Sequence, residues 1–165
     1  MKLIVLYGPE DSGKTTTLEM VYERLKRINI KDTHCFWYLD EIQRDFIDVL
    51  VIDKTRLGDA GCNPPMRTST TQPEPIKIGI VTQGDYVRGS NAIDDHLQFL
   101  LKENCEIAIC PCSEIPATTT PKDKIDAFVS ANKGVVSIVD ESHIKPYSNE
   151  MEIANKILIA VKNNC

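Results

Sequence analysis

No run of apolar residues in the 165-residue sequence approaches the length of about 20 residues that a membrane-spanning helix needs. Long basic stretches are also missing, and the formal net charge is −5. An acidic chain without a basic patch is poorly suited to binding nucleic acid or an anionic membrane. We therefore expect neither as the main partner, and any phosphate that the protein binds must be held by a local site.

Cysteine pairs with metal-binding spacing are missing as well. The six cysteines include no CxxC pair, and no histidine lies near Cys105, Cys110 and Cys112. We expect buried thiols here, and neither a metal site nor a disulfide framework. The three histidines stand far apart in the sequence, so none is assigned a catalytic role. The apolar run at residues 3–7 ends in a glycine-rich turn instead of a cleavage site, which argues against a signal peptide and for a cytoplasmic protein.

Two kinds of apolar pattern alternate along the chain. Short continuous apolar runs are typical of strands buried on both faces, and apolar residues that recur every three or four positions are typical of helices. The predicted strands are residues 3–7, 35–39, 76–82, 106–110 and 135–139, and the predicted helices are residues 14–29, 91–103, 120–134 and 149–162. This alternation predicts one domain over residues 1–165, with an α/β fold of three layers and a mostly parallel sheet covered by helices on both faces.

Residues 46–53 have two interpretations. The segment reads FIDVLVID, like a buried strand that ends in Asp53. Too few residues separate it from the strand at 35–39 for a parallel crossover, which needs at least about 10 residues, so two strands here must form an antiparallel hairpin. Asp53 would then lie at the edge of the sheet away from the ligand. In the alternative, apolar residues between positions 39 and 50 form the stripe of a helix.

Residues 54–75 form a long polar segment with four prolines. A loop of this length in a compact domain is usually either disordered or functional. In the functional case it is a mobile flap that faces the substrate and carries Arg56 and Arg67.

A glycine-rich motif follows the first predicted strand. Residues 8–15 read GPEDSGKT, which fits the phosphate-binding pattern GxxxxGK[ST] between a buried strand and an amphipathic helix. Glycines let successive backbone N–H groups converge on one anion, and the helix start adds a partial positive charge. We expect the Lys14 ammonium to reach the β- and γ-phosphates, the Thr15 hydroxyl to bind Mg²⁺, and Thr16 to contact the α-phosphate. The residues expected to bind the nucleotide are Gly8, Pro9, Glu10, Asp11, Ser12, Gly13, Lys14, Thr15 and Thr16.

With this motif in this setting, the chain resembles the P-loop NTPases, and most of all their branch of small nucleoside and nucleotide kinases. A softer similarity is the apolar strand that ends in aspartate at residues 135–140, with a closing helix at 149–162. The resemblance covers nearly the whole chain. It implies an ATP- and Mg²⁺-binding kinase that transfers the γ-phosphoryl group to a small-molecule acceptor, and it implies that residues 142–147 contact the nucleobase.

The segment that corresponds to the arginine-bearing lid of such kinases departs from their pattern. Residues 113–124 contain no arginine, and Lys122 and Lys124 are their only cations. Lysine is a poorer bidentate partner for a transferring phosphoryl group than arginine. The alternative function is therefore a non-kinase one: an NTP-binding regulator or weak NTPase whose bound state changes a partner surface.

Further charged candidates follow the predicted strands. The strand at 76–82 is expected beside the P-loop strand, so Asp85 is a candidate to hold Mg²⁺ through water or to orient an acceptor, and Arg88 a candidate to pair with a phosphate. Their alternative is a turn with a surface arginine. Asp40 and Glu41 stand where related kinases place acceptor-binding acids, or else in a solvated turn. The predicted catalytic residues are thus Lys14, Asp85 and Arg88, and the predicted metal ligands are Thr15 and Asp85.

Overall fold

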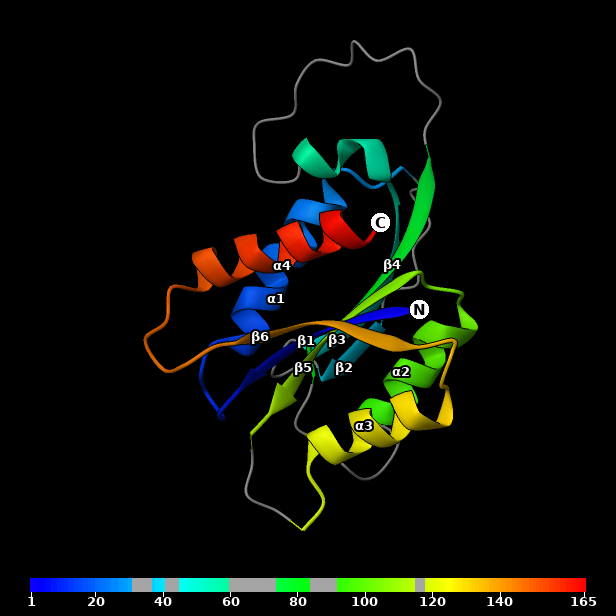
Figure 1. Cartoon of the computed structure of the whole chain (residues 1–165). Coiled ribbons are helices and arrows are strands. Elements are labelled where there is room, and N and C mark those ends of the chain that lie inside the picture. The colour runs from blue at the N-terminus through cyan, green and yellow to red at the C-terminus, as the bar shows by residue number, and fades with distance from the viewer. Residues whose placement is uncertain (31–36, 41–44, 60–73, 84–91, 115–117) are drawn as a thin grey trace.

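The computed structural model describes residues 1–30, 37–40, 45–59, 74–83, 92–114 and 118–165 (Figure 1). The strands are β1 (Lys2–Gly8), β2 (Trp37–Asp40), β3 (Asp45–Asp53), β4 (Pro75–Val81), β5 (Ile107–Ser113) and β6 (Ser137–His143). The helices are α1 (Lys14–Lys26), α2 (Ile93–Lys102), α3 (Pro121–Ala131) and α4 (Glu150–Asn164), with a short 3₁₀ helix, η1 (Lys54–Asp59). Four candidates named above, Glu41, Arg67, Asp85 and Arg88, lie outside the described residues.

The strands form one six-stranded sheet in the order β2-β3-β4-β5-β1-β6. β4, β5, β1 and β6 pair in parallel, whereas β3 runs antiparallel to both β2 and β4. The predicted α/β fold with a mostly parallel sheet is confirmed. The predicted hairpin is confirmed too, because β2 and β3 pair antiparallel. The helix alternative for the segment between positions 39 and 50 is wrong for its described part.

The position of β4 in the sheet corrects the prediction. The sequence predicts β4 directly beside β1, but β5 lies between them. All seven residues of β5 are buried, so this strand takes a central place with a neighbour on each side. β1 is therefore flanked by β5 and β6, and the residues that end these two strands lie nearest to the loop at residues 8–15.

Helices cover both faces of the sheet (Figure 1). α1 and α4 pack together on one face, and α2 and α3 pack together on the other. The side chains of β1 alternate between the two sides. Ile4 and Leu6 join the core cluster that contains α1 and α4, whereas Leu3, Val5 and Tyr7 join the cluster that contains α2 and α3. Tyr7 therefore lies on the α2/α3 face, directly before the glycine-rich loop begins.

β5 extends further than the sequence predicts. It continues through Pro111 to Ser113, although proline has no N–H group for a strand ladder and is rare in central strands. The pairing of β5 with β4 ends at Ile109, while its pairing with β1 continues to Ser113. Pro111 therefore lies beyond the part of β5 that pairs with β4.

The pairing of β6 with β1 contains an irregularity. The register shifts by one residue, so that Val139 has no partner on β1. A bulge of this kind changes which residues face each side of the sheet beyond it. Glu141 and His143 consequently pair opposite Val5 and Tyr7, and they share the α2/α3 face with them.

The described part of the predicted flap at residues 54–75 is not a polar loop. η1 forms its beginning, and Leu57 is buried among core residues of α1 and α4. Because β3 runs antiparallel to β4, η1 and its Arg56 lie at the edge of the sheet opposite the carboxyl ends of the parallel strands. In this structure Arg56, which the functional interpretation places on a flap that faces the substrate, therefore lies at the opposite edge of the sheet from residues 8–15.

Candidate functional site

The glycine-rich loop links the end of β1 to the start of α1. Two of its residues have positive φ, Asp11 at 54° and Gly13 at 90°. Gly13 is the N-cap of α1, and no side chain of the described residues caps this helix start. The first N–H groups of α1 therefore remain directed at the loop, where the helix dipole adds a partial positive charge. A loop of this shape is suited to receive an anion.

Lys14, the first residue of α1, folds back over the loop. Its ammonium donates hydrogen bonds to the carbonyl oxygens of Gly8 at 3.1 Å and Pro9 at 2.6 Å. The residue is only 7% exposed. A buried charge needs polar partners, and the loop carbonyls supply them. The ammonium is thus held at the end of β1.

The space available requires glycine at position 8, and a positive φ favours glycine at position 13. A Cβ at Gly8 would lie 2.6 Å from the carbonyl oxygen of Ile144 and 2.7 Å from Oγ of Ser12, which is closer than side chains tolerate. A Cβ at Gly13 would lie 3.0 Å from Oε1 of Glu150. The loop is therefore packed against the segment that joins β6 to α4, and this contact fixes its shape.

Buried polar atoms without partners gather at this edge of the sheet. Oγ of Ser12, Oγ of Ser113 and Oε1 of Gln83 are buried, and no described residue offers them a hydrogen bond. Ser12 belongs to the loop, Ser113 ends β5, and Gln83 follows β4, all at the carboxyl ends of the parallel strands. Leaving a buried polar group unpaired costs about 1–3 kcal/mol. A polar ligand at this edge would remove that cost, and open α/β sheets bind ligands there.

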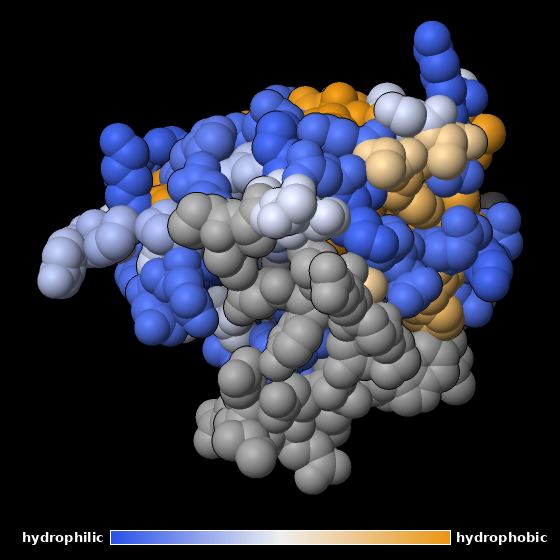
Figure 2. Space-filling view, turned by 90° about the horizontal axis from the view of Figure 1, so that it is seen from below, coloured by the Kyte–Doolittle hydropathy of each residue, from blue (hydrophilic) through white to orange (hydrophobic). Residues whose placement is uncertain are grey.

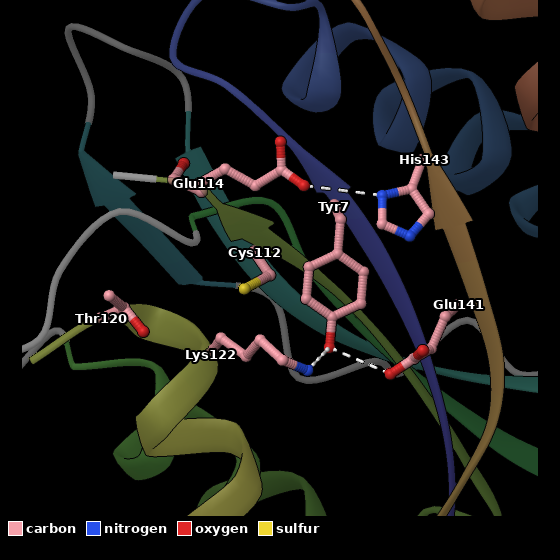
Figure 3. A pocket seen from close by; sticks show the side chains of 8 residues that line it. Tyr7, Cys112, Glu114, Thr120, Lys122, Glu141 and His143 are labelled. Carbon is pink, nitrogen blue, oxygen red and sulfur yellow. Dashed lines mark hydrogen bonds and ion pairs between the residues drawn. The ribbon is translucent and has the colours of Figure 1, made fainter. Parts of the chain in front are cut away.

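A cavity of about 470 Å³ opens beside the loop, on the α2/α3 face (Figure 3). Its walls come from the ends of β1, β5 and β6 and from the start of α3. The lining residues are Tyr7, Cys112, Ser113, Glu114, Thr120, Lys122, Glu141 and His143. The start of α3 is fixed by a capping box, since Thr120 accepts a hydrogen bond from the N–H of Asp123 and the Asp123 carboxylate accepts one from the N–H of Thr120.

Tyr7 lies at the centre of this cavity (Figure 3). Its hydroxyl donates to Oε1 of Glu141 at 3.3 Å and accepts from Nζ of Lys122 at 3.5 Å. Burial is the main reason that the pKa of Tyr7 is raised well above its ordinary value, and the negative charge of Glu141 adds to it. The Lys122 ammonium lies 5.0 Å from the centre of the Tyr7 ring and 3.7 Å from the Asp126 carboxylate. Tyr7 is therefore a neutral hydrogen-bonding group.

Glu114 and His143 form a second pair at the rim of the cavity (Figure 3). Nδ1 of His143 lies 3.5 Å from Oε1 of Glu114, and the imidazole stacks on the Tyr7 ring at a centroid distance of 5.1 Å. The backbone N–H of Glu114 donates to the carbonyl oxygen of Gly8 at 3.0 Å. This hydrogen bond ties the carboxylate-bearing residue directly to the glycine-rich loop.

The structure groups some of the predicted residues and separates others. The nine residues predicted to bind the nucleotide lie together in the loop and the first turn of α1. Asp40 ends β2, and three strands separate β2 from β1, so Asp40 does not reach the loop. Residues 142–147 do approach it, because Ile144 packs on Gly8. In the same segment Tyr147 is fully exposed, with a φ of 66°.

Sequence reasoning missed Tyr7, Glu114, Glu141 and His143 as members of one cavity. It ends the two strands beside β1 at residues 110 and 139, which leaves Glu114 in a lid and His143 isolated. A signal was available in residues 137–143, where charged side chains continue directly from an apolar strand. Which face these side chains take depends on the bulge at Val139, which the sequence does not reveal.

Comparison of the chain with protein-family models, with curated proteins and with solved structures gave no match. Among the described residues, no helix combines the length and the apolar character that a membrane span needs. The same part of the chain contains no group of three or more histidine, cysteine, aspartate or glutamate residues arranged to hold a metal.

Proposed function

We propose that the chain is an ATP- and Mg²⁺-binding P-loop protein, a small kinase that transfers the γ-phosphoryl group of ATP to a small-molecule acceptor. The observation that carries this proposal is the position of the Lys14 ammonium against the carbonyls of Gly8 and Pro9, in a loop that has two residues of positive φ. A triphosphate in this loop offers the ammonium anionic partners. Hydrogen bonds between charged groups are about twice as strong as neutral ones.

Residues 8–16 are assigned to the triphosphate. The N–H groups of the loop and of the start of α1 bind phosphate oxygens, and Lys14 neutralises charge on the β- and γ-phosphates. The Thr15 hydroxyl is a hard oxygen donor, which fits Mg²⁺, and bound Mg²⁺ supplies charge neutralisation at the phosphate oxygens. We further propose that Asp85 is a ligand of Mg²⁺ and that Arg88 pairs with a phosphate.

A kinase needs room for an acceptor beside the phosphates. The cavity lined by Tyr7 and Glu114 supports this requirement, because it shares the end of β1 with the loop. The rival function, an NTP-binding regulator or weak NTPase, is favoured by the lack of arginine in residues 113–124. A kinase depends on its acceptor for turnover and a weak NTPase does not.

The proposed location is the cytoplasm. Cys105, Cys110 and Cys112 are free thiols in the core, although Cys110 and Cys112 are only two positions apart. Unpaired cysteines of this kind are typical of reducing compartments.

Calorimetric titration with MgATP tests nucleotide binding. The Lys14→Ala variant should bind MgATP about 10- to 100-fold more weakly, since hydrogen bonds to charged groups contribute about 1.5–3 kcal/mol. Lys26→Ala is the matched control, because Lys26 is an exposed lysine at the other end of α1. Equal affinity of Lys14→Ala and the wild-type protein would overturn the proposal. Measuring ADP formation with and without small alcohols then separates a kinase from a weak NTPase.

A further inference from the structure

The cavity on the α2/α3 face adjoins the glycine-rich loop without being part of it. Ser113 pairs with Gly8 in the sheet, and the N–H of Glu114 donates to the Gly8 carbonyl, so the two sites share the end of β1. The charge of Lys14 also acts on Cys112, which lines the cavity. A ligand in the cavity would therefore lie next to the group that holds the terminal phosphates.

The charges that line the cavity disfavour an anionic ligand. Glu114 and Glu141 place two carboxylates on its wall. Among the described lining residues the single lysine, Lys122, already has Asp126 at 3.7 Å and the Tyr7 ring beneath its ammonium. From these described residues, a phosphate or carboxylate on the ligand would meet two like charges and no cation without an acidic neighbour. Carboxylates instead accept hydrogen bonds from hydroxyl groups.

The aromatic wall of the cavity fits the carbon skeleton of such a ligand. The rings of Tyr7 and His143 stack with an angle of 21° between their planes (Figure 3). Both residues line the cavity together with the two carboxylates. The volume of about 470 Å³ lies in the range of small-molecule sites.

We propose that this cavity binds a small neutral polyol, of the size of a monosaccharide, as the phosphoryl acceptor. The acceptor role rests on the proposed function. In the transfer, a hydroxyl oxygen of the polyol forms a bond to the γ-phosphorus while the bond from that phosphorus to the β,γ-bridging oxygen breaks. ADP leaves with the bonding electron pair, and the proton of the hydroxyl passes to the carboxylate of Glu114.

Saturation-transfer NMR on the full chain tests the binding step without turnover. The neutral probes are D-ribose, D-glucose and myo-inositol, and the anionic probes are ribose 5-phosphate and gluconate, each at about 10 mM to detect millimolar binding. At least one neutral probe should bind, and its affinity should fall about tenfold in Glu141→Gln. Glu152→Gln is the control, because that carboxylate is exposed on α4 and pairs with Lys156. MgATP affinity should remain unchanged in both variants.

The outcomes separate this inference from the function on which it rests. Neutral-probe binding that is lost in Glu141→Gln, with MgATP binding retained, supports the inference. No neutral probe bound, or binding of the anionic probes alone, overturns it even where MgATP binds normally. If the protein binds the neutral probes through Glu141 but does not bind MgATP, the polyol site is supported and the proposed kinase function is overturned.

Discussion

Asp53 is the last residue of β3 and Glu114 is the first residue after β5, and the surroundings of these two carboxylates differ. Asp53 ends β3 and is 6% exposed. It accepts hydrogen bonds from the N–H and hydroxyl of Thr55, at 3.0 and 2.7 Å, and from the N–H of Glu74 at 3.3 Å. Glu114 follows β5, and its exposed carboxylate has His143 at 3.5 Å.

The direction of the strand explains this difference. β3 runs antiparallel to its neighbours, so its last residue reaches the edge at which β4 begins. β5 runs parallel to β1, so its last residue arrives beside Gly8. The role of an acidic residue after an apolar run therefore cannot be inferred from that pattern alone. Asp53 stabilises a turn, whereas Glu114 lines a cavity. In Figure 2, hydrophilic residues make up most of the coloured surface, with apolar patches between them.

The largest effect is expected at the loop edge, from Gly8→Ala. The new Cβ would lie 2.6 Å from a backbone oxygen of Ile144, which has little freedom to move. We expect a loss of about 3 kcal/mol of unfolding free energy, at the upper end of the range for overpacking. Gly134→Ala is the control: it has φ of 88° but no atom within 4 Å of the new Cβ, so only backbone strain of about 1 kcal/mol remains. Equal urea midpoints for the two variants would contradict the close packing of the loop.

Asp53→Ala should affect stability and not ligand binding. Removal of an acceptor that serves three donors should lower the unfolding free energy by about 2 kcal/mol. Glu114→Ala should change it by less than about 0.5 kcal/mol, because the side chain is exposed. Urea unfolding measures both values, and calorimetry should give the same MgATP affinity for Asp53→Ala as for the wild-type protein. A weaker MgATP affinity in Asp53→Ala would break the distinction between the two edges.

A smaller, pH-dependent effect is expected from the same carboxylate. Burial by itself would raise the pKa of Asp53, but the hydrogen bonds from Thr55 and Glu74 and the charge of Arg56 lower it below the ordinary value of 3.8. A lowered pKa in the folded state stabilises the protein above the ordinary value, and this contribution is lost as the pH falls through the folded value. The difference in unfolding free energy between the wild-type protein and Asp53→Asn should therefore shrink on acidification from pH 5 toward and below the ordinary pKa. A constant difference over this range would show that the charge plays no part.

The smallest effect concerns the thiol in the cavity. Burial raises the pKa of Cys112 to about 12, which leaves almost no thiolate at neutral pH. We expect no alkylation of Cys112 by iodoacetamide at neutral pH within an hour, as followed by peptide mass spectrometry. The urea-unfolded protein is the control and should be alkylated at this position. Rapid labelling of folded Cys112 would show that the cavity admits solvent to the sulfur.

Local features of the fold follow from short stretches of sequence. The Thr120 capping box, the Asn149 cap of α4 and the helix after the glycine-rich loop are all formed as the residues predict. The hairpin of β2 and β3 was predictable as well, because the length of a connection limits the direction of the next strand. Features of this kind depend on residues close together in the sequence.

Features set by distant residues were not predictable. The order of the strands depends on contacts between residues far apart in the sequence, and the prediction placed β4 where β5 lies. Pro111 marks a strand end by its chemistry, but the absence of β4 pairing beyond Ile109 lets β5 continue. Met151 is an apolar residue of α4 and is nevertheless 46% exposed, since the stripe of α4 that meets the sheet is defined by its neighbours. The members of the cavity were missed for the same reason.

The contact between Gly8 and Ile144 has a consequence for how the protein is made. During synthesis the glycine-rich motif leaves the ribosome long before its supports, and Tyr7 and Glu141, which meet in the fold, are 134 positions apart in the chain. Contacts across such separations form late, because long loops must close first. A nascent chain therefore carries the motif without the N–H groups of Ile144 and Glu114, which donate to the carbonyl oxygens of Tyr7 and Gly8 in the folded protein. A ligand that binds the supported loop would therefore stabilise molecules in which β6 has paired with β1 more than molecules in which it has not.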